Sequence, residues 1–317
     1  MEITDVMQSA RRYVDWDVVR NHYGRQDSIR FTPFNYRIRD SIAIPTTTTF
    51  DVKPTPEFTS FQILHNNSDS TQSQIVRISE KLTETTTHTT TQGYRLGGEI
   101  TSTTTGSINA NFILANVNIE QTIRLSITGE YNHSSTTSRT YTTERLWEIS
   151  QPVNVPPFSR VVATLVVMKA QISIPIRLST NIQGLGETPS FNNILFFANF
   201  QDFRNNPMFM GYEAAALADR RWPDRPSVFE SGDMGGSLNL VGFGNSHTTP
   251  ALYSIVRFEQ LPLSGYSGET KTWYSDQIQL RNGGILTIPN FDPTTKIFSS
   301  NGIPISPEEA EGIEFTE

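Results

Sequence analysis

Apolar and polar residues alternate strictly along two neighbouring segments, residues 108–114 and 117–127. In the first segment the apolar residues occupy even positions, and in the second they occupy odd positions. A period of two predicts β-strands with one apolar and one polar face. A two-residue turn at Ala115-Asn116 would set Leu114 opposite Val117 and bring the apolar residues of both strands to one face. The pattern therefore predicts an amphipathic hairpin within residues 100–130.

The two faces of this hairpin differ in chemistry, with one misfit on each, Gln121 on the apolar face and Ile113 on the polar face. Glu120 and Arg124 are the only charged residues between Ile100 and Thr128, and both lie on the polar face. The large apolar residues of the other face are Ile108, Phe112, Leu114, Val117, Ile119, Ile123, Leu125 and Ile127. The main polar residues are Asn109, Asn111, Glu120, Thr122 and Arg124.

An ordinary sheet hairpin with its apolar side on the core is the common interpretation of such a pattern. Two features favour a hairpin that enters a membrane. Each arm can supply ~9–11 alternating residues, the length of a tilted transmembrane strand. The flanks are polar tracts, with seven Thr in residues 83–91 and eight Ser or Thr in residues 134–143. In a membrane, the apolar face would contact lipid and the polar face would line a water-filled lumen.

Most of the remaining chain is typical of strands. Residues 58–82, interrupted at 65–69, form the first long strand region, and residues 161–168, 172–182, 251–261, 271–280 and 285–288 are further strands. One short helix is predicted over residues 5–20, with Asp5 as its N-cap. Residues 45–56 are rich in Thr and Pro and indicate a linker or edge segment. The fold class is therefore mainly β.

Composition and charge remove several classes of protein. The 317 residues carry a net charge of −7 and form no basic stripe, so a nucleic-acid partner is not expected. No apolar run approaches the ~18 residues of a transmembrane helix. The absence of cysteine excludes disulfides, thiolate metal sites and cysteine nucleophiles. The N-terminus lacks the basic-then-apolar order of a signal peptide, so we expect either another route of export or a signal already removed.

The chain offers little that is typical of an enzyme. Its five histidines show no metal-ligand spacing, and neither HExxH nor a G-x-S-x-G elbow is present. The Gly-rich segment at residues 231–236 lacks the Lys-Ser/Thr ending of a phosphate loop. We therefore expect no catalytic residues, no metal and no cofactor. His88 and His133 lie in the Ser/Thr tracts, and we interpret them as solvated strand histidines, with a role in pH sensing as the alternative.

Two further regions allow alternatives. Residues 184–249 are rich in aromatic residues, and their side chains either form a core, which is the more common outcome, or stack on sugars. The candidate receptor-binding residues there are Trp222, Tyr212 and Phe209. Residues 301–317 contain five Glu and no Lys or Arg. This tail is either a solvated terminus or a removable pro-segment.

Short motifs along the chain resemble those of the aerolysin-type β-pore-forming toxins, in the epsilon-toxin/mosquitocidal-toxin family, and within it the small insecticidal crystal proteins. The likeness covers residues 58–182 and 251–290, whereas residues 1–50 and 184–249 do not match. The matching motifs are Asn66-Asn67-Ser68, Gln72-Ser73-Gln74, Gln92-Gly93-Tyr94, Asn132-His133-Ser134, Ile149-Ser150-Gln151-Pro152, Val161-Val162-Ala163-Thr164, Val256-Arg257-Phe258-Glu259-Gln260, Lys271-Thr272-Trp273-Tyr274 and Asn282-Gly283.

The resemblance implies an elongated, aerolysin-like fold of long antiparallel strands with a small α+β head. It divides the chain into a receptor-binding head (1–50 and 184–249), a β-sandwich body (51–99, 131–183 and 250–290), an insertion hairpin (100–130) and a C-terminal tail (291–317).

The same resemblance implies an insecticidal pore-forming toxin, secreted or deposited as a crystal inclusion by a bacterium. Its expected partners are a target-cell membrane, an unknown glycan or protein receptor, an activating host protease, and further copies of itself. A lectin-like β protein that binds glycans without forming pores is the alternative.

Overall fold

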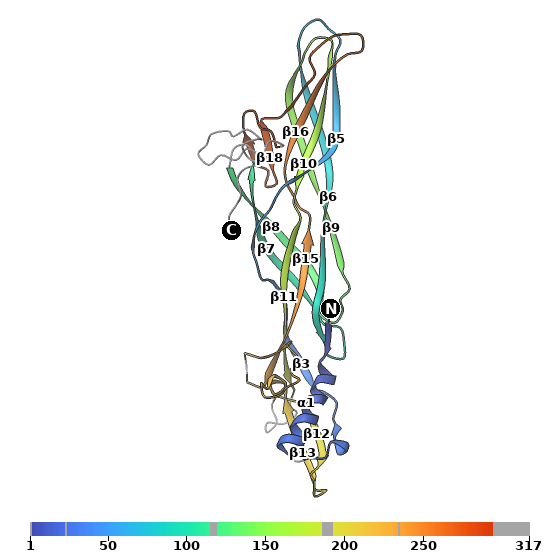
Figure 1. The fold of residues 1–317 in the computed structure, drawn as a ribbon, viewed down its shortest axis with the longest axis vertical. Helices are drawn as coiled ribbons and strands as arrows, with labels where there is room; N and C mark the ends of the chain where they lie inside the picture. Colours follow the sequence, from blue (N-terminus) through green and yellow to red (C-terminus); the bar gives the residue numbers. More distant parts are fainter. Residues whose placement is uncertain (1, 23, 115–118, 186–192, 234, 294–317) are drawn as a thin grey trace, which may run out of the picture.

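The protein is long and narrow, and its long strands run close to the molecular axis (Figure 1). The computed structural model describes residues 2–22, 24–114, 119–185, 193–233 and 235–293. A head containing α1 (Val6–Asn21) lies at one end, and the turn between β5 (Thr55–Asn66) and β6 (Gln72–Arg95) lies at the other (Figure 1). The predicted architecture, mainly β, elongated and built from long antiparallel strands, is confirmed.

Two large sheets form the body. In the seven-stranded sheet the path is β1-β6-β15-β11-β3, with β14 beside β15 and β9 beside β6. Its strands are β1 (Glu2–Asp5), β3 (Tyr36–Pro45), β6 (Gln72–Arg95), β9 (Arg139–Val155), β11 (Ile172–Gly184), β14 (Phe229–Ser231) and β15 (Ser237–Thr248). In the six-stranded sheet the path is β19-β18-β16-β10-β5, with β17 beside β16. Its strands are β5 (Thr55–Asn66), β10 (Ser159–Lys169), β16 (Ala251–Pro262), β17 (Lys271–Tyr274), β18 (Gln277–Leu280) and β19 (Ile285–Thr287).

Two small sheets complete the described part of the chain. One lies in the head and consists of β13 (Pro207–Glu213), β12 (Ile194–Gln201) and β2 (Arg30–Phe31), in that order. The other flanks the middle of the body and consists of β4 (Thr49–Asp51), β7 (Thr101–Leu114) and β8 (Ile119–Asn132) (Figure 1). The short 3-10 helices η1 (Gln26–Ser28) and η3 (Ala214–Ala218) belong to the head segments.

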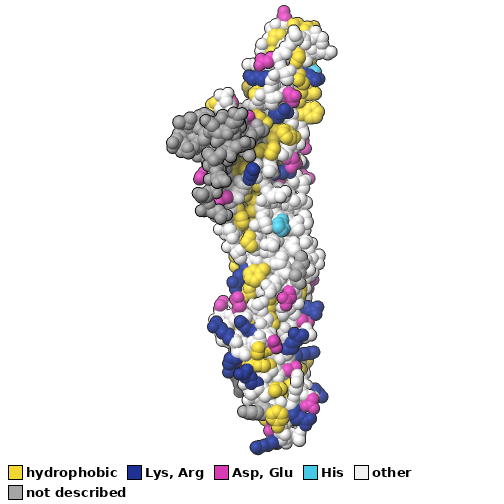
Figure 2. All heavy atoms as spheres, viewed as in Figure 1, with side chains coloured by type: hydrophobic (Ala, Val, Ile, Leu, Met, Phe, Trp, Pro, Cys, Tyr) yellow, Lys and Arg dark blue, Asp and Glu magenta, His cyan; other side chains and the backbone are white. Residues whose placement is uncertain are grey.

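The first Ser/Thr tract, residues 83–91, lies in β6, and residues 139–143 of the second tract begin the neighbouring strand β9. The two strands pair antiparallel from Gln72↔Val155 to His88↔Arg139, which brings parts of the two tracts opposite each other. They do so in the seven-stranded sheet, however, and not as a continuation of the β7–β8 pair. Ser and Thr suit a strand whose face is half exposed. Correspondingly, Figure 2 shows few charged side chains over the middle of the visible face.

Three clusters of buried side chains follow one another along the molecule. The upper cluster joins β5, β6, β9, β10 and β16 and contains Trp147. The middle cluster joins the β7–β8 pair to β11 and to the adjoining ends of β10 and β16. The head cluster joins α1 to β12 and to the segments that follow it.

The helix predicted over residues 5–20 is α1, and Asp5 caps it, because the Asp5 carboxylate accepts a hydrogen bond from the Gln8 backbone N–H at 3.0 Å. The limits drawn for the head need adjustment. The strands β3 and β15 fall within the ranges given to the head, yet both pair with β11 in the body sheet. The alternating apolar residues of β3 and β15 belong to strands of the body sheet, whereas the buried side chains of the head come mainly from residues 6–29 and 195–240.

Candidate functional site

The strands β7 and β8 form the predicted hairpin, in a different register from the one predicted. Leu114 lies opposite Ile119, Ala110 opposite Ile123 and Ile108 opposite Leu125. The predicted partner of Leu114 was Val117, so a two-residue turn at Ala115-Asn116 was wrong. Four residues, 115–118, separate the last pair, and they lie outside the described residues. The displacement is two residues, and because side chains alternate with period two, every face assignment is retained.

The predicted apolar face lies against the body. Six of its eight large residues are at most 4% exposed, whereas Ile119 at the hairpin tip is 39% exposed and Val117 lies outside the described residues. The Phe112 ring stacks on the Tyr253 ring of β16, with centroids 5.5 Å apart and planes 14° apart. The six buried residues are Ile108, Phe112, Leu114, Ile123, Leu125 and Ile127. Burial of these six side chains on one face follows from the alternation.

The predicted polar face points to solvent. The Arg124 guanidinium donates from Nε to the Ser107 hydroxyl at 2.8 Å, across the two strands. The Thr122 hydroxyl likewise donates to the Asn111 side-chain oxygen at 2.9 Å. Ile113, the misfit of this face, is 54% exposed. The exposed polar residues are Asn109, Glu120, Thr122 and Arg124, and Asn111 is half-buried.

A short segment, residues 48–52, covers the outer edge of β7, and we call it the strap. Its strand β4 runs parallel to β7, with Thr49 beside Asn109 and Asp51 beside Asn111. The Asn109 N–H donates to the Thr48 carbonyl at 2.7 Å, and the Val52 N–H donates to the Asn111 carbonyl at 2.8 Å. The strap therefore satisfies backbone groups of an edge that would otherwise be open.

His133 fastens the base of the hairpin to the body. Its backbone N–H donates to the Ile100 carbonyl, and its own carbonyl accepts from the Tyr94 N–H, both at 2.8 Å. The imidazole Nε2 lies 2.6 Å from the Ser102 hydroxyl of β7, and Nδ1 lies 2.8 Å from the Tyr94 hydroxyl of β6. The side chain is completely buried. Burial lowers the pKa of the His133 imidazole to about 4, so it is neutral near pH 7.

His88 makes a second fastening a short distance away. Its Nδ1 lies 2.6 Å from the Ser246 hydroxyl of β15 and 3.2 Å from the Tyr131 hydroxyl of β8. Its ring lies directly over Gly129, where a Cβ atom would come within 1.9 Å of Nε2. Burial lowers the pKa of His88 as well. We call the contacts of His88 and His133 with their partners the base cluster.

The interpretation of both histidines as solvated was therefore wrong, because His88 is 2% exposed and His133 is 0% exposed. In the Thr-rich tracts most side chains are small and polar on both faces of the strand. The sequence therefore does not indicate which face is buried. The strap was also missed as part of this site, since its residues were assigned to a Thr- and Pro-rich linker or edge segment.

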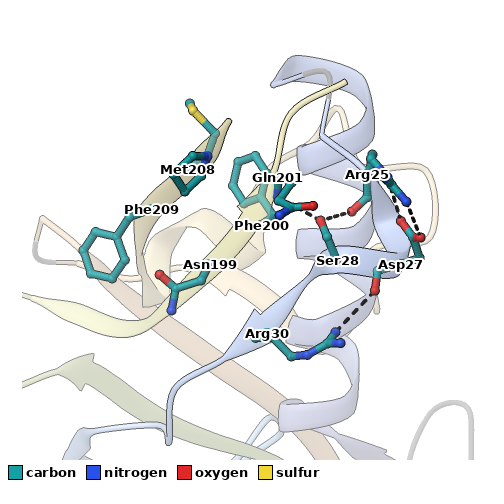
Figure 3. Close-up of a pocket in the computed structure, with 10 residues that line it drawn as sticks. Arg25, Asp27, Ser28, Arg30, Asn199, Phe200, Gln201, Met208 and Phe209 are labelled. Carbon is teal, nitrogen blue, oxygen red and sulfur yellow. Dashed lines mark hydrogen bonds and ion pairs between the residues drawn. The ribbon is translucent and has the colours of Figure 1, made fainter. Parts of the chain in front are cut away.

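In the head, the structure corrects two of the three candidate receptor-binding residues. Trp222 and Tyr212 are 3% and 4% exposed and belong to the head core. The Tyr212 hydroxyl donates to the buried Asp17 carboxylate at 2.9 Å, and the Trp222 ring packs edge-on against Tyr13. These side chains cannot stack on a sugar from solution. Phe209 is 57% exposed and borders a pocket of the head (Figure 3).

Other chemistry is sparse in the described parts of the chain. Within them, no three His, Asp or Glu side chains lie close enough together to hold a metal ion. Among the helices of the same residues, none has the length and apolar character needed to cross a bilayer.

Comparison with known proteins gives consistent matches. The family model described as Clostridium epsilon toxin ETX/Bacillus mosquitocidal toxin MTX2 matches residues 22–272. The pesticidal crystal protein Cry15Aa of Bacillus thuringiensis subsp. thompsoni is 34% identical over 298 residues, which cover 90% of this chain and 82% of that protein.

Three solved structures share the fold. The Cry23Aa1–Cry37Aa1 binary protein complex matches with a TM-score of 0.58 and 18% identity, over 91% of this chain and 98% of the matched chain. A non-toxic crystal protein from Bacillus thuringiensis matches with a TM-score of 0.58 and 14% identity, over 84% of this chain and 100% of the matched chain. The β-pore-forming protein Mpp75Aa1.1 from Brevibacillus laterosporus matches with a TM-score of 0.51 and 18% identity, over 86% of this chain and 95% of the matched chain.

Proposed function

The chain belongs to the Clostridium epsilon toxin ETX/Bacillus mosquitocidal toxin MTX2 family, as its motifs predicted, and from this premise we propose that it is an insecticidal pore-forming toxin. It binds a target-cell membrane, oligomerises and inserts a β-barrel made from the β7–β8 hairpin. One observation carries the proposal. The hairpin buries six large apolar side chains of one face against the body, while β7 and β8 are paired with each other along their whole length.

The buried face explains why a trigger is needed. Exposure of each large apolar side chain to water would cost ~1.5–3 kcal/mol, so the hairpin stays on the body until another apolar medium is available. A bilayer is such a medium. In the inserted state the lipid-facing residues are Ile108, Phe112, Leu114, Val117, Ile119, Ile123, Leu125 and Ile127. The lumen-facing residues are Asn109, Asn111, Glu120, Thr122 and Arg124.

Oligomerisation follows from the edges of the hairpin. A single hairpin in lipid would leave the outer backbone groups of both strands without hydrogen-bond partners, at several kcal/mol for each group. Only a closed barrel, assembled from several copies, removes those edges. The charged side chains of Glu120 and Arg124 would then lie in water rather than in lipid.

Activation and delivery are proposed by analogy with the family. The acidic tail, residues 291–317, is a pro-segment removed by a host protease, and the producing bacterium deposits the protein as a crystal inclusion, as the name of Cry15Aa indicates for that relative. The head then meets the target surface first, through a glycan or protein receptor.

A glycan-binding protein that forms no pores is the second candidate. The exposed Phe209 ring on the head favours it, because an exposed aromatic ring is a natural platform for a sugar. The same fold also occurs in a crystal protein described as non-toxic, so the fold does not decide between the two functions.

Insertion is tested by single cysteines along β8, because the native chain contains no cysteine. Each variant carries a polarity-sensitive dye and is treated with trypsin before target-cell membranes are added. Positions 123, 125 and 127 should report transfer to lipid, and the neighbouring positions 122, 124 and 126 serve as matched controls that should remain in water.

Three outcomes separate the hypotheses. A period-two profile accompanied by leakage supports the inserted hairpin. A flat profile accompanied by leakage keeps the pore-forming function but assigns insertion to another segment. A flat profile without leakage, on membranes that bind the protein, favours the glycan-binding candidate.

A further inference from the structure

Three side chains form a row across the outer face of the head sheet. Asn199 of β12 lies opposite Phe209 of β13 on one side and opposite Arg30 of β2 on the other. Residues directly opposite each other in a sheet share a face. The neighbours Ala198 and Phe200 are buried in the head core, so the row must face outward. We call Arg30, Asn199 and Phe209 the head row.

The aromatic end of the head row is held in place. Phe209 is 57% exposed, and its ring lies flat against Phe197, with centroids 4.7 Å apart and planes 13° apart. Gly211 is opposite Phe197, and a Cβ atom there would come 3.1 Å from the Phe197 ring. The Phe209 ring therefore offers an accessible apolar surface without swinging freely, which lowers the entropic cost of stacking a ligand on it.

The polar end is also held in place, by the segment that precedes β2. The Arg25 N–H donates to the Gln201 carbonyl at 2.8 Å, and the Gln201 N–H donates to the Ser28 hydroxyl at 2.8 Å, which fixes this segment beside β12. Arg30 Nη1 donates to the Asp27 and Ile29 carbonyls. A guanidinium has five N–H donors, so these two bonds leave others for a ligand.

The row borders a pocket of about 550 Å³, within the range of small-molecule sites, and Figure 3 shows that its lining residues come from three segments. Of the two guanidinium groups that line it, that of Arg25 is paired with a carboxylate. The Arg25 guanidinium makes two hydrogen bonds to the Asp27 carboxylate, at 2.8 and 3.3 Å, and the hydrogen bond with Arg25 lowers the pKa of Asp27. Arg30 donates to backbone carbonyls, so the pocket keeps one cationic group beside an aromatic platform, a combination that suits the hydroxyl groups and apolar face of a sugar.

We propose that the head row binds an oligosaccharide on the target surface. The apolar C–H face of one sugar ring stacks on Phe209, and its hydroxyl groups exchange hydrogen bonds with the Asn199 amide and the Arg30 guanidinium. An amide both donates and accepts, and so matches a hydroxyl, which does the same. This inference rests on the proposed function, since it identifies the receptor chemistry that the head would recognise.

The test uses the full chain and a panel of immobilised neutral and sialylated oligosaccharides, with affinities measured by surface plasmon resonance. Phe209→Ala and Asn199→Ala should each weaken binding at least tenfold, whereas Phe209→Trp should retain it. The matched control is Phe203→Ala, because Phe203 is 65% exposed on the turn between the same two strands but lies outside the row. Thermal unfolding should be unchanged in Asn199→Ala and Phe203→Ala, whose side chains are exposed, and should change only slightly in the Phe209 variants, whose ring contacts Phe197.

Two results would overturn the proposal. One is absence of saturable binding to every oligosaccharide of the panel. The other is a combination of two findings. Phe203→Ala and Phe209→Ala lose the same amount of binding affinity, and the parent binds plain phosphatidylcholine vesicles as tightly as it binds the oligosaccharides. Together these would identify the turn as a lipid contact.

Leakage from glycan-free vesicles at high protein concentration is measured in parallel. If Phe209→Ala loses glycan binding but permeabilises these vesicles like the parent, both proposals stand. If the parent binds glycan but permeabilises no membrane, pore formation fails and the head row stands. If it permeabilises membranes without binding any glycan, the head row alone fails.

Discussion

The hairpin β7–β8 and the body strand β10 both bury apolar residues, yet their backbones are held very differently. β10 is paired along nearly its whole length with β16 on one side and with β5 on the other. β7 pairs with β8 along its 14 residues, but on its other side, within the described part of the chain, only the three residues of β4 pair with it. Burial alone would not distinguish the two regions.

The difference lies in what must break when each region moves. Withdrawal of β10 would leave two rows of backbone groups without partners, at a cost of ~1–3 kcal/mol for each group that stays buried. The hairpin keeps its main ladder when it leaves. Among the described residues, the strap, the base cluster, the apolar contact with the body and a few polar contacts at its base, such as the Thr90 hydroxyl with the Asn132 carbonyl and Arg139 with Glu130, hold it. A segment can therefore be well packed and still be detachable, provided that its backbone pairing is internal.

The largest effect is expected when a covalent bond attaches the hairpin to the body as firmly as β10 is attached. Thr49 of the strap and Asn109 of β7 are exposed neighbours in the parallel pair, and Cα atoms of such neighbours lie ~4.8 Å apart, within the usual range of a disulfide. We expect the oxidised Thr49→Cys/Asn109→Cys protein to cause no leakage above background, and reduction to restore it.

The control for this tether is Thr105→Cys/Thr128→Cys, a cross-link between facing residues within the hairpin. Its oxidised form should cause leakage like the parent, because the hairpin can still leave as a unit. Full leakage from the oxidised strap cross-link would contradict release of the hairpin.

Weakening the apolar contact should have the next largest effect. Phe112→Ala removes the ring that stacks on Tyr253, and loss of a buried phenylalanine costs about 3–5 kcal/mol. We expect faster hydrogen exchange of the β7–β8 amides and a lower unfolding temperature. Ile113→Ala, at the adjacent exposed position, should change stability by no more than about 0.5 kcal/mol. Equal effects of the two substitutions would mean that the packed face does not hold the hairpin.

Acid should destabilise the base cluster, with a loss of stability similar to or smaller than that caused by Phe112→Ala. Burial lowers the pKa of His133 to about 4, below the ordinary value of 6.5, so the folded state favours the neutral imidazole. The unfolded chain therefore binds more protons between these values, and stability is lost as the pH falls from about 6.5 to about 4, by about 3 kcal/mol in total. Above pH 7 this contribution is fully present.

Chemical unfolding at a series of pH values measures this loss. Gln at position 133 cannot be protonated, so His133→Gln should reduce the pH dependence and leave the part due to buried His88, whereas His247→Gln, at an exposed position of β15, should leave it as in the parent. If His133→Gln kept the parent's full slope, the loss of stability in acid would originate elsewhere in the protein.

The smallest expected effect concerns the polar face alone. Glu120→Gln should leave binding and leakage rates unchanged and reduce the preference of single channels for cations, because one negative charge per copy leaves the lumen. Arg124→Gln should shift the preference in the opposite direction. Reversal potentials measured across planar bilayers under a salt gradient test both variants. Identical selectivity in the parent and in both variants would show that these residues do not line the conducting path.

The sequence predicted the faces of the hairpin better than its register. Alternation between Val117 and Ile127 reveals which residues share a face without any knowledge of the partner strand. The turn was less informative, because Ala115 and Asn116 gave only a weak preference for a two-residue turn. The resulting error of two residues left the faces unchanged, whereas an error of one would have inverted them.

Features that depend on distant packing were predicted poorly. Trp222 and Tyr212 became core residues because α1 supplies Tyr13 and Asp17 to cover them, and nothing local indicates that contact. His88 and His133 are buried for a comparable reason, since their partners Ser246 and Tyr94 come from other strands. Burial of a polar residue follows from the tertiary partner that satisfies it, and a local pattern does not contain that partner.

The continuous ladder between β7 and β8 has a consequence for the geometry of assembly. We call each line of backbone hydrogen bonds between two neighbouring strands a seam. In a closed ring of such hairpins, seams within one copy alternate with seams between copies. Every second seam already exists in the single chain, so closure requires only as many new seams as there are copies. The number of strands is then always even, whatever the number of copies, and loss of one copy would open two seams at once.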